Sequence, residues 1–253
     1  MNDVKRNFGQ KPGPPVQIEA HDGILLVDKP SGPTSHDVVD KIRKRFRFRK
    51  VGHGGTLDPQ ATGLLIILLG KGTKLSNRII ASDKVYQGVM RLGISTDSHD
   101  SQGKVLQEAD WSHVTKEQLE DQIKKFTGDM YQTPPMVSAV KVNGVPLYKS
   151  ARKGKVVERK ARLIHVYEFK LLEFTPPDAG FLLRCTKGTY VRSLCSDIGD
   201  ALGCGACLTE LRRTRCGDFK IEDALACDNV IKMERDELVS KVIPMEKLPA
   251  YCI

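Results

Sequence analysis

Short apolar runs and helical apolar stripes alternate along this chain, which predicts a mixed α/β protein. Gly23–Asp28 and Leu64–Leu69 are apolar or nearly apolar over the length of a strand, and the second run is typical of a buried strand. Between them a helix is expected with Ser35 as its N-cap. Its core-facing positions recur at helical spacing: Val38, Val39, Ile42 and Phe46.

The second half of the chain continues the alternation. Thr115 and Gln118 fit a capping box for a helix that ends near Gly128, and the apolar positions of 191–202 predict another helix. Further strands are expected near 84–94, 163–174 and 181–186. The Asn143-Gly144 pair lies between short β-prone stretches, so 131–160 is interpreted as a projecting hairpin. The last 25 or so residues predict one helix and a closing strand.

These elements leave space for one main domain. Residues 1–20 hold several prolines and little hydrophobic periodicity, so we interpret them as a flexible tail before a domain spanning 21–253. The longest apolar run is far shorter than the roughly 20 residues that cross a bilayer, and no signal peptide is evident. A cytoplasmic protein with reduced cysteines is expected.

The net charge of the chain indicates which class of partner it binds. Lys and Arg total 40 against 31 Asp and Glu, which gives a net charge of +9 and favours a nucleic acid as partner. Seven of the ten residues in Lys41–Lys50 are basic, and further basic groups occur in 149–162 and 212–215. A solvated surface and an RNA or DNA contact are both open interpretations of these clusters.

Two patterns suggest a metal site, and we interpret neither as one. The polar loop 96–103 is similar to a calcium loop but lacks the glutamate that would close it. Cys204 and Cys207 have C-x2-C spacing, yet no second pair completes four ligands at the usual distance.

The strongest chemical candidate is Asp58, in a glycine-rich loop between the basic segment and the buried strand. Pro59 biases Asp58 away from helical conformation, so its carboxylate can project into a cleft. An ordinary structural turn is the alternative. Arg192 falls in the first turn of a predicted helix, off its apolar stripe, where a buried salt bridge would explain it.

Five motifs in order strengthen the catalytic interpretation. They are Lys29-Pro30-x-Gly32-x-Thr34-Ser35, Gly52-His53-x-Gly55-Thr56-Leu57-Asp58-Pro59-x-Ala61-Thr62-Gly63, Lys84-x-Tyr86, Pro134-Pro135-x-x-Ser138-Ala139-x-Lys141-x-x-Gly144 and Gly188-Thr189-Tyr190-x-Arg192-Ser193-Leu194. Together they resemble the TruB family of pseudouridine synthases over residues 24 to about 220. The resemblance implies isomerisation of uridine 55 in the T-arm of transfer RNA (tRNA), without cofactor, metal or obligatory protein partner. It also implies the pseudouridine synthase fold, an α/β (α+β) fold with a central, mixed, antiparallel-rich sheet flanked by helices and an inserted RNA-binding hairpin at 131–160.

The resemblance assigns roles residue by residue. Asp58 matches the catalytic aspartate, Arg192 the arginine that pairs with it, and Tyr86 the tyrosine that packs on the target base. Further positions match the rest of the substrate pocket: Tyr190, Leu211, Lys29 at its floor, and His53, which fills the base stack after nucleotide flipping. An ionised carboxylate suits a reaction that breaks and re-forms a glycosidic bond. Attack on uracil C6 and attack on ribose C1′ both remain open.

Two departures from the family pattern change the expectations. We expect no C-terminal RNA-binding PUA domain, and Cys207 stands where the family commonly has histidine. The main rival function is a basic RNA-binding or RNA-folding protein without turnover. The resemblance extends to the guide-dependent dyskerin branch, although a stand-alone enzyme fits this chain better.

Overall fold

A computed structural model describes residues 21–252 apart from 139, 143, 148–153 and 155–156. Its strands are β1 Gly23–Lys29, β2 Val51–His53, β3 Thr62–Leu69, β4 Lys84–Leu92, β5 Ile94–Thr96, β6 Val105–Glu108, β7 Gly128–Gln132, β8 Lys141–Val142, β9 Val145–Pro146, β10 Arg162–Thr175, β11 Asp178–Cys185, β12 Ala206–Cys216, β13 Phe219–Lys220, β14 Leu225–Ala226 and β15 Ile243–Pro244. The α-helices are α1 Ser35–Phe46, α2 Ser76–Ala81, α3 Lys116–Lys125, α5 Val191–Ala201, α6 Cys227–Lys232 and α7 Arg235–Ser240, and the 3₁₀ turns are η1 Gly70–Leu75, η2 Ile221–Asp223, η3 Met245–Lys247 and η4 Ala250–Cys252. The predicted tail, 1–20, lies outside the described residues.

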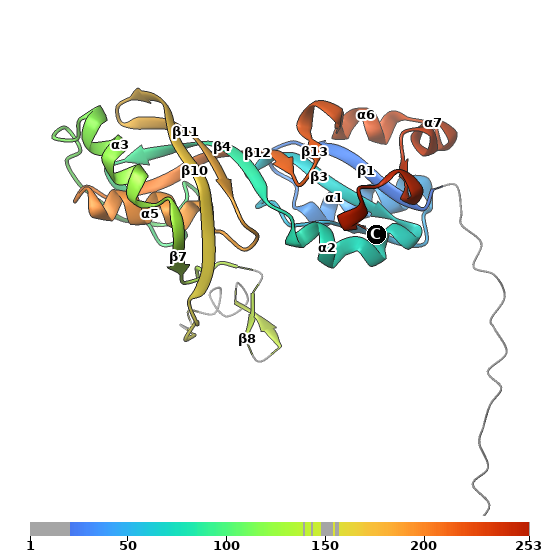
Figure 1. The fold of residues 1–253 in the computed structure, drawn as a ribbon, viewed down its shortest axis with the longest axis horizontal. Coiled ribbons are helices and arrows are strands. Elements are labelled where there is room, and N and C mark those ends of the chain that lie inside the picture. Colours follow the sequence, from blue (N-terminus) through green and yellow to red (C-terminus); the bar gives the residue numbers. More distant parts are fainter. Residues whose placement is uncertain (1–20, 139, 143, 148–153, 155–156, 253) are drawn as a thin grey trace, which may run out of the picture.

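One large sheet runs the length of the molecule (Figure 1). Its main path has the order β14-β1-β3-β12-β4-β11-β10-β7, with β2, β13 and β15 paired beside it. The pairs β1–β14 and β3–β12 are parallel, and the other pairs of this sheet are antiparallel. The predicted mixed, antiparallel-rich sheet is therefore confirmed.

The half of the sheet around β1 and β3 is covered on both faces. Alternate side chains of β3 pack with α1, α6 and α7 on one face and with α2, η1 and β13 on the other. All six residues of Leu64–Leu69 are consequently fully buried. A strand buried on both faces needs no polar positions, which explains the continuous apolar run in the sequence.

The other half, built from β4, β10, β11 and β12, has helices on one face. Apolar residues of α3 and α5 form a core with these strands, including Leu119, Leu194 and Phe181. Gln87 and Arg91 of β4 point to the other face and are exposed. Because α5 covers only part of its face, a stretch of β4 and β12 stays uncovered beside the start of that helix.

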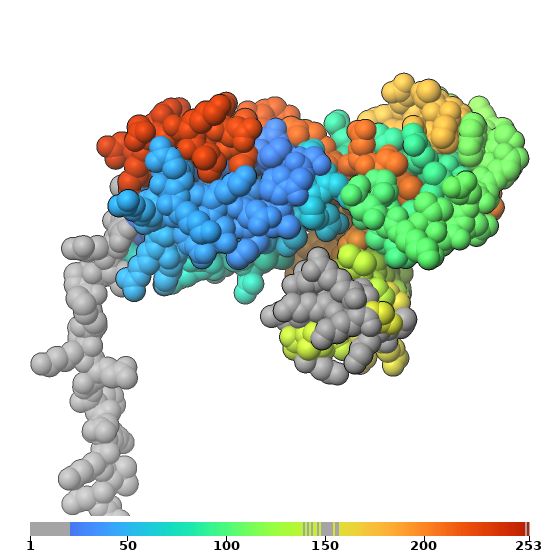
Figure 2. All heavy atoms as spheres, turned by 180° about the vertical axis from the view of Figure 1, so that it is seen from behind, coloured from blue at the N-terminus to red at the C-terminus, as the bar shows by residue number. Residues whose placement is uncertain are grey.

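The inserted hairpin lies between β7 and β10. Within it, β8 and β9 pair antiparallel, as the Asn-Gly signal predicts. The described part of this segment projects from the body of the molecule (Figure 2). The basic residues predicted at 149–155, which are Lys149, Arg152, Lys153 and Lys155, all lie outside the described residues.

Two local predictions were wrong. The N-cap of α1 is Thr34, whose hydroxyl accepts from the Asp37 N–H at 3.0 Å while Asp37 accepts from the Thr34 N–H at 2.9 Å. This reciprocal box leaves the Ser35 hydroxyl free to turn inward. The C-terminal region forms two short helices, α6 and α7, because Met233 adopts an extended conformation and interrupts the helical stretch.

Among the described residues, none of the helices is long and apolar enough to cross a membrane.

Candidate active site

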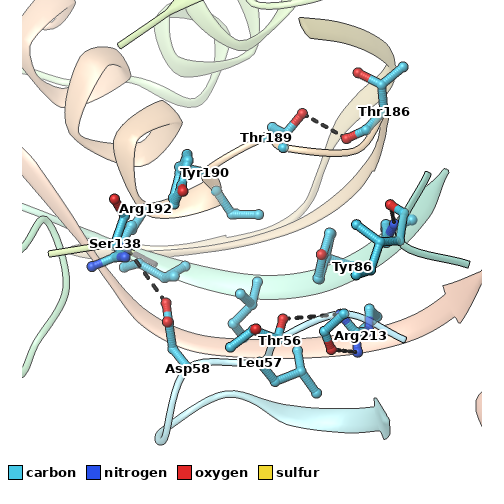
Figure 3. A pocket seen from close by; sticks show the side chains of 17 residues that line it. Thr56, Leu57, Asp58, Tyr86, Ser138, Thr186, Thr189, Tyr190, Arg192 and Arg213 are labelled. Carbon is cyan, nitrogen blue, oxygen red and sulfur yellow. Dashed lines mark hydrogen bonds and ion pairs between the residues drawn. The ribbon is translucent and has the colours of Figure 1, made fainter. Parts of the chain in front are cut away.

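A cleft of about 280 Å³ opens beside the first turn of α5, over the uncovered stretch of β4 and β12. Five of the seven predicted site residues line it: Asp58, Tyr86, Tyr190, Arg192 and Leu211 (Figure 3). They come from the loop after β2, from β4, from the residues at the start of α5, and from β12. The fold thus brings together residues separated by more than 100 positions.

The last residue of β1, Lys29, and the first residue of α1, Ser35, hold the Asp58 loop in place. The buried Lys29 ammonium donates to the Pro59 carbonyl at 2.9 Å and to the carbonyls of Pro30 and Pro33, each at 2.8 Å. The Ser35 hydroxyl accepts from the Leu57 N–H at 2.8 Å and donates to the Leu57 carbonyl at 3.0 Å. Backbone on both sides of Asp58 is therefore fixed, and its carboxylate stands on a rigid support.

Arg213 of β12 holds the other end of the loop. It is 1% exposed, and its guanidinium donates to the carbonyls of Leu64 at 2.8 Å, Gly55 at 3.1 Å and Thr56 at 3.3 Å. Gly63, with φ 98°, lies so close to the Arg213 backbone that an added Cβ would be 2.3 Å from its carbonyl oxygen. Neither interpretation of the basic cluster 212–215, a solvated surface or a nucleic-acid contact, holds for Arg213, because strand register turns this side chain into the protein.

Arg192 connects Asp58 to a second carboxylate. Its Nε lies 3.6 Å from Asp58 Oδ2 and its Nη1 3.7 Å from Asp100 Oδ2. The Asp58 side chain is 45% exposed, whereas those of Arg192 and Asp100 are 5% and 7% exposed. Substrate can therefore reach the Asp58 carboxylate while the charges behind it are shielded from water, which strengthens their interaction. The buried salt bridge expected at Arg192 is present.

Asp100 is a site residue that the sequence analysis missed. It lies in the polar loop considered only as a calcium site, and its Oδ1 accepts from the Ser98 hydroxyl at 2.6 Å and the Gln102 N–H at 3.0 Å. The same loop supplies the Ser98 carbonyl, 3.4 Å from Arg192 Nη1. The available signal was an aspartate flanked by a hydroxyl donor two residues before it and an amide donor two residues after it, yet its Arg192 partner is 92 positions away.

Aromatic and aliphatic side chains form the remaining walls. Burial raises the pKa of Tyr86 to about 12, so its phenol stays neutral at physiological pH. Tyr190 is fixed through its backbone, because its N–H donates to Gln132 Oε1 at 2.7 Å and its carbonyl accepts from Gln132 Nε2 at 3.0 Å. A neutral, largely apolar wall next to a carboxylate suits a planar, uncharged base.

Lys29 and His53 do not line the cleft. Lys29 lies beneath the loop, where burial lowers the pKa of its amine to about 8. His53 is on β2, and burial lowers the pKa of its imidazole; its Nδ1 accepts from the Gly55 N–H at 3.3 Å. In this structure both residues contact the Asp58 loop from outside the cleft.

In the described part of the chain, no three His, Cys, Asp or Glu side chains are grouped so that they could hold a metal ion. The buried cysteines include Cys204, in the turn after α5, and Cys207, at the start of β12.

Family models cover most of the chain. The N-terminal domain of TruB family pseudouridylate synthases matches residues 43–191, and the tRNA pseudouridylate synthase B C-terminal domain matches residues 192–248. The chain belongs to the TruB family. The boundary between the two family models falls at Arg192, so the paired residues Asp58 and Arg192 come one from each matched region.

Individual TruB relatives support this membership. The tRNA pseudouridine synthase B of Opitutus terrae is 50% identical over 224 residues, which cover 88% of this chain and 93% of that protein. The enzyme of the same name from Geotalea uraniireducens is 48% identical over 215 residues, covering 85% of this chain and 69% of the relative.

A solved structure confirms the fold. The match is to a Cbf5–Nop10–Gar1 complex, with a TM-score of 0.71, 33% identity and 90% of this chain covered. The chain spans 61% of the length of that matched chain. The predicted pseudouridine synthase fold is therefore confirmed.

Proposed function

We propose that this protein isomerises uridine 55 in the T-arm of tRNA to pseudouridine, at the Asp58 cleft. Its family and its relatives named tRNA pseudouridine synthase B support the activity. The single observation that carries the assignment of the site is the exposed Asp58 carboxylate, 3.6 Å from the buried Arg192 guanidinium in a cleft of about 280 Å³.

The reaction breaks the bond from C1′ to N1 and forms one from C1′ to C5. C5 loses a proton and N1 gains one, so the atoms balance without an oxidant, reductant or cofactor. Asp58 is the reacting carboxylate, and the Arg192 guanidinium, with Nε 3.6 Å from Asp58 Oδ2, fixes its orientation. Attack at C6 and attack at C1′ both agree with this geometry.

The target base has to leave its stack before Asp58 can reach it. In this proposal Tyr86, Tyr190 and Leu211 surround the extruded base, and His53, outside the cleft, fills the gap left in the RNA. Lys29 acts through the loop, since it supports the backbone that carries Asp58 and does not face the base.

RNA is held by surfaces around the cleft. The net charge of +9 and the projecting segment at 131–160 favour contacts to phosphates on both sides of the target nucleotide. The segment acts as a clamp on the T-stem-loop in this proposal. A cytoplasmic location belongs to the same proposal, because tRNA is the substrate.

The direct test uses the 253-residue protein and an unmodified tRNA transcript, without guide RNA or protein partner. Nucleoside analysis and mapping of the modified position are expected to reveal pseudouridine at position 55. Tight RNA binding without pseudouridine would favour the non-catalytic RNA-binding alternative. Modification that requires a guide RNA would instead place the protein's function with the dyskerin branch.

A further inference from the structure

Ser138 lines the same cleft and has no part in the proposed reaction. Its residue is 5% exposed, and its Oγ has no hydrogen-bond partner among the described residues. A buried hydroxyl without a partner destabilises the folded protein, because its hydrogen bonds to water are lost and not replaced. Such a group in a cleft wall is a candidate ligand contact.

The other buried polar side chains of the cleft are occupied by the fold itself. Lys84 donates to the carbonyls of Ile80 and Ser82, each at 2.6 Å, and Arg213 donates to three carbonyls of the Asp58 loop region. Arg192 faces two carboxylates and two carbonyls. Among these buried side chains, Ser138 is the one whose hydrogen-bonding capacity remains available to a substrate.

The position of Ser138 identifies which part of a nucleotide it meets. The carbonyl of its neighbour Val137 accepts from Arg192 Nη2, so Ser138 is fixed beside the guanidinium that faces Asp58. In Figure 3, Ser138 and Arg192 lie on one side of Asp58, and Tyr86 lies on the other. With the base against Tyr86 and the glycosidic carbon at Asp58, the ribose extends toward Ser138.

We infer that the Ser138 hydroxyl hydrogen-bonds the ribose 2′-hydroxyl of the target nucleotide and so helps the site distinguish RNA from DNA. Both groups donate and accept hydrogen bonds, and the 2′-hydroxyl is the group that separates the two nucleic acids at a single position. The inference rests on the proposed function, because it places a flipped uridine in this cleft.

The test is a thermodynamic cycle between protein and RNA. Two proteins are compared, Asp58→Asn alone and Asp58→Asn combined with Ser138→Ala. The Asp58→Asn change is used because it lets the protein bind RNA without modifying it. Each protein binds two T-stem-loop RNAs that differ at the target position, one with uridine and one with 2′-deoxyuridine. We expect Ser138→Ala to raise Kd about fivefold to tenfold for the uridine RNA and less than twofold for the deoxyuridine RNA.

An equal loss with both RNAs, or no loss with the uridine RNA, would overturn the ribose contact. Binding is measured without catalysis, so this result is independent of whether the parent enzyme forms pseudouridine at position 55. A parent without that activity would refute the proposed function, and the cycle would still report whether Ser138 senses the 2′-hydroxyl.

Ser193 provides the matched control. It is 4% exposed, its Oγ also lacks a partner among the described residues, and it directly follows Arg192 without lining the cleft. Ser193→Ala is expected to leave both Kd values within twofold. Neither alanine variant is expected to lower the melting temperature, because each removes a buried hydroxyl that the fold leaves unpaired. A lower melting temperature for Ser138→Ala would assign its hydroxyl to the fold and count against the inference.

Discussion

Asp100 and Arg192 form a buried ion pair, with 3.7 Å between Oδ2 and Nη1, directly behind the exposed Asp58 carboxylate. The guanidinium therefore has one carboxylate partner that solvent and substrate can reach and one that they cannot. The buried partner fixes the arginine before substrate arrives, and the exposed partner remains available to react. This asymmetry makes different predictions for the two aspartates.

Asp58→Asn is expected to lower the pseudouridylation rate about 10³-fold or more, because the amide is not a competent nucleophile. RNA binding should change only a few-fold, since the side-chain volume is nearly unchanged. Single-turnover nucleoside analysis and an RNA titration measure the two effects. A residual rate of one tenth of the parent's would refute the catalytic assignment.

Asp100→Asn is expected to reduce both rate and stability. It removes the buried negative charge beside Arg192, and breaking a buried pair costs on the order of 3 kcal/mol. Denaturant unfolding and single-turnover rates measure the loss. Asp97→Asn is the control in the same loop, because Asp97 is exposed and is expected to change stability by less than about 0.5 kcal/mol.

Arg192→Lys keeps the positive charge but removes the planar group that reaches Asp58 and Asp100 through different nitrogens. We expect the single-turnover rate to fall about 100-fold while far-ultraviolet circular dichroism stays unchanged. A near-parental rate would show that charge alone suffices beside Asp58.

Arg213→Met tests the support of the catalytic loop. Methionine fills similar space but leaves the carbonyls of Gly55, Thr56 and Leu64 without their donor, so a loss of about 3 kcal/mol in unfolding free energy is expected. Arg215→Met on the same strand is the control, because that side chain is 48% exposed and its loss should cost less than about 0.5 kcal/mol. Equal losses of unfolding free energy in the two variants would show that Arg213 does not specifically support the Asp58 loop.

Lys29 makes the free energy of unfolding depend on pH. Burial lowers the pKa of its amine from 10.5 to about 8 in the folded state. Below pH 8 the amine is protonated in both states, and the folded protein bears the full cost of the buried charge. Between pH 8 and 10.5 the unfolded chain binds more protons, so stability rises with pH by about 1.4 kcal/mol per unit from this group. Unfolding free energies at pH 7 and 9.5, compared with those of Lys29→Met, isolate the effect; a pH-independent difference would contradict the lowered pKa.

Local sequence determined the elements that carry the site. The apolar run Leu64–Leu69 predicted β3, and the stripe through Leu194 and Ile198 predicted α5 with Arg192 in its first turn. These predictions succeeded because burial on two faces and helical periodicity leave their pattern in adjacent residues. Motif order along the chain was sufficient to assign the family.

Tertiary structure decided how the charges are paired. Arg213 and Arg215 look equivalent in sequence, but pairing with β3 and β4, including a register shift between these two residues, buries one and exposes the other. Asp100 became a site residue because its loop runs beside β12, where the Ser101 N–H donates to the Leu208 carbonyl. Sheet register brings such partners together over long sequence distances. Because the pattern of neighbouring residues does not specify that register, it cannot predict which charged side chains will pair.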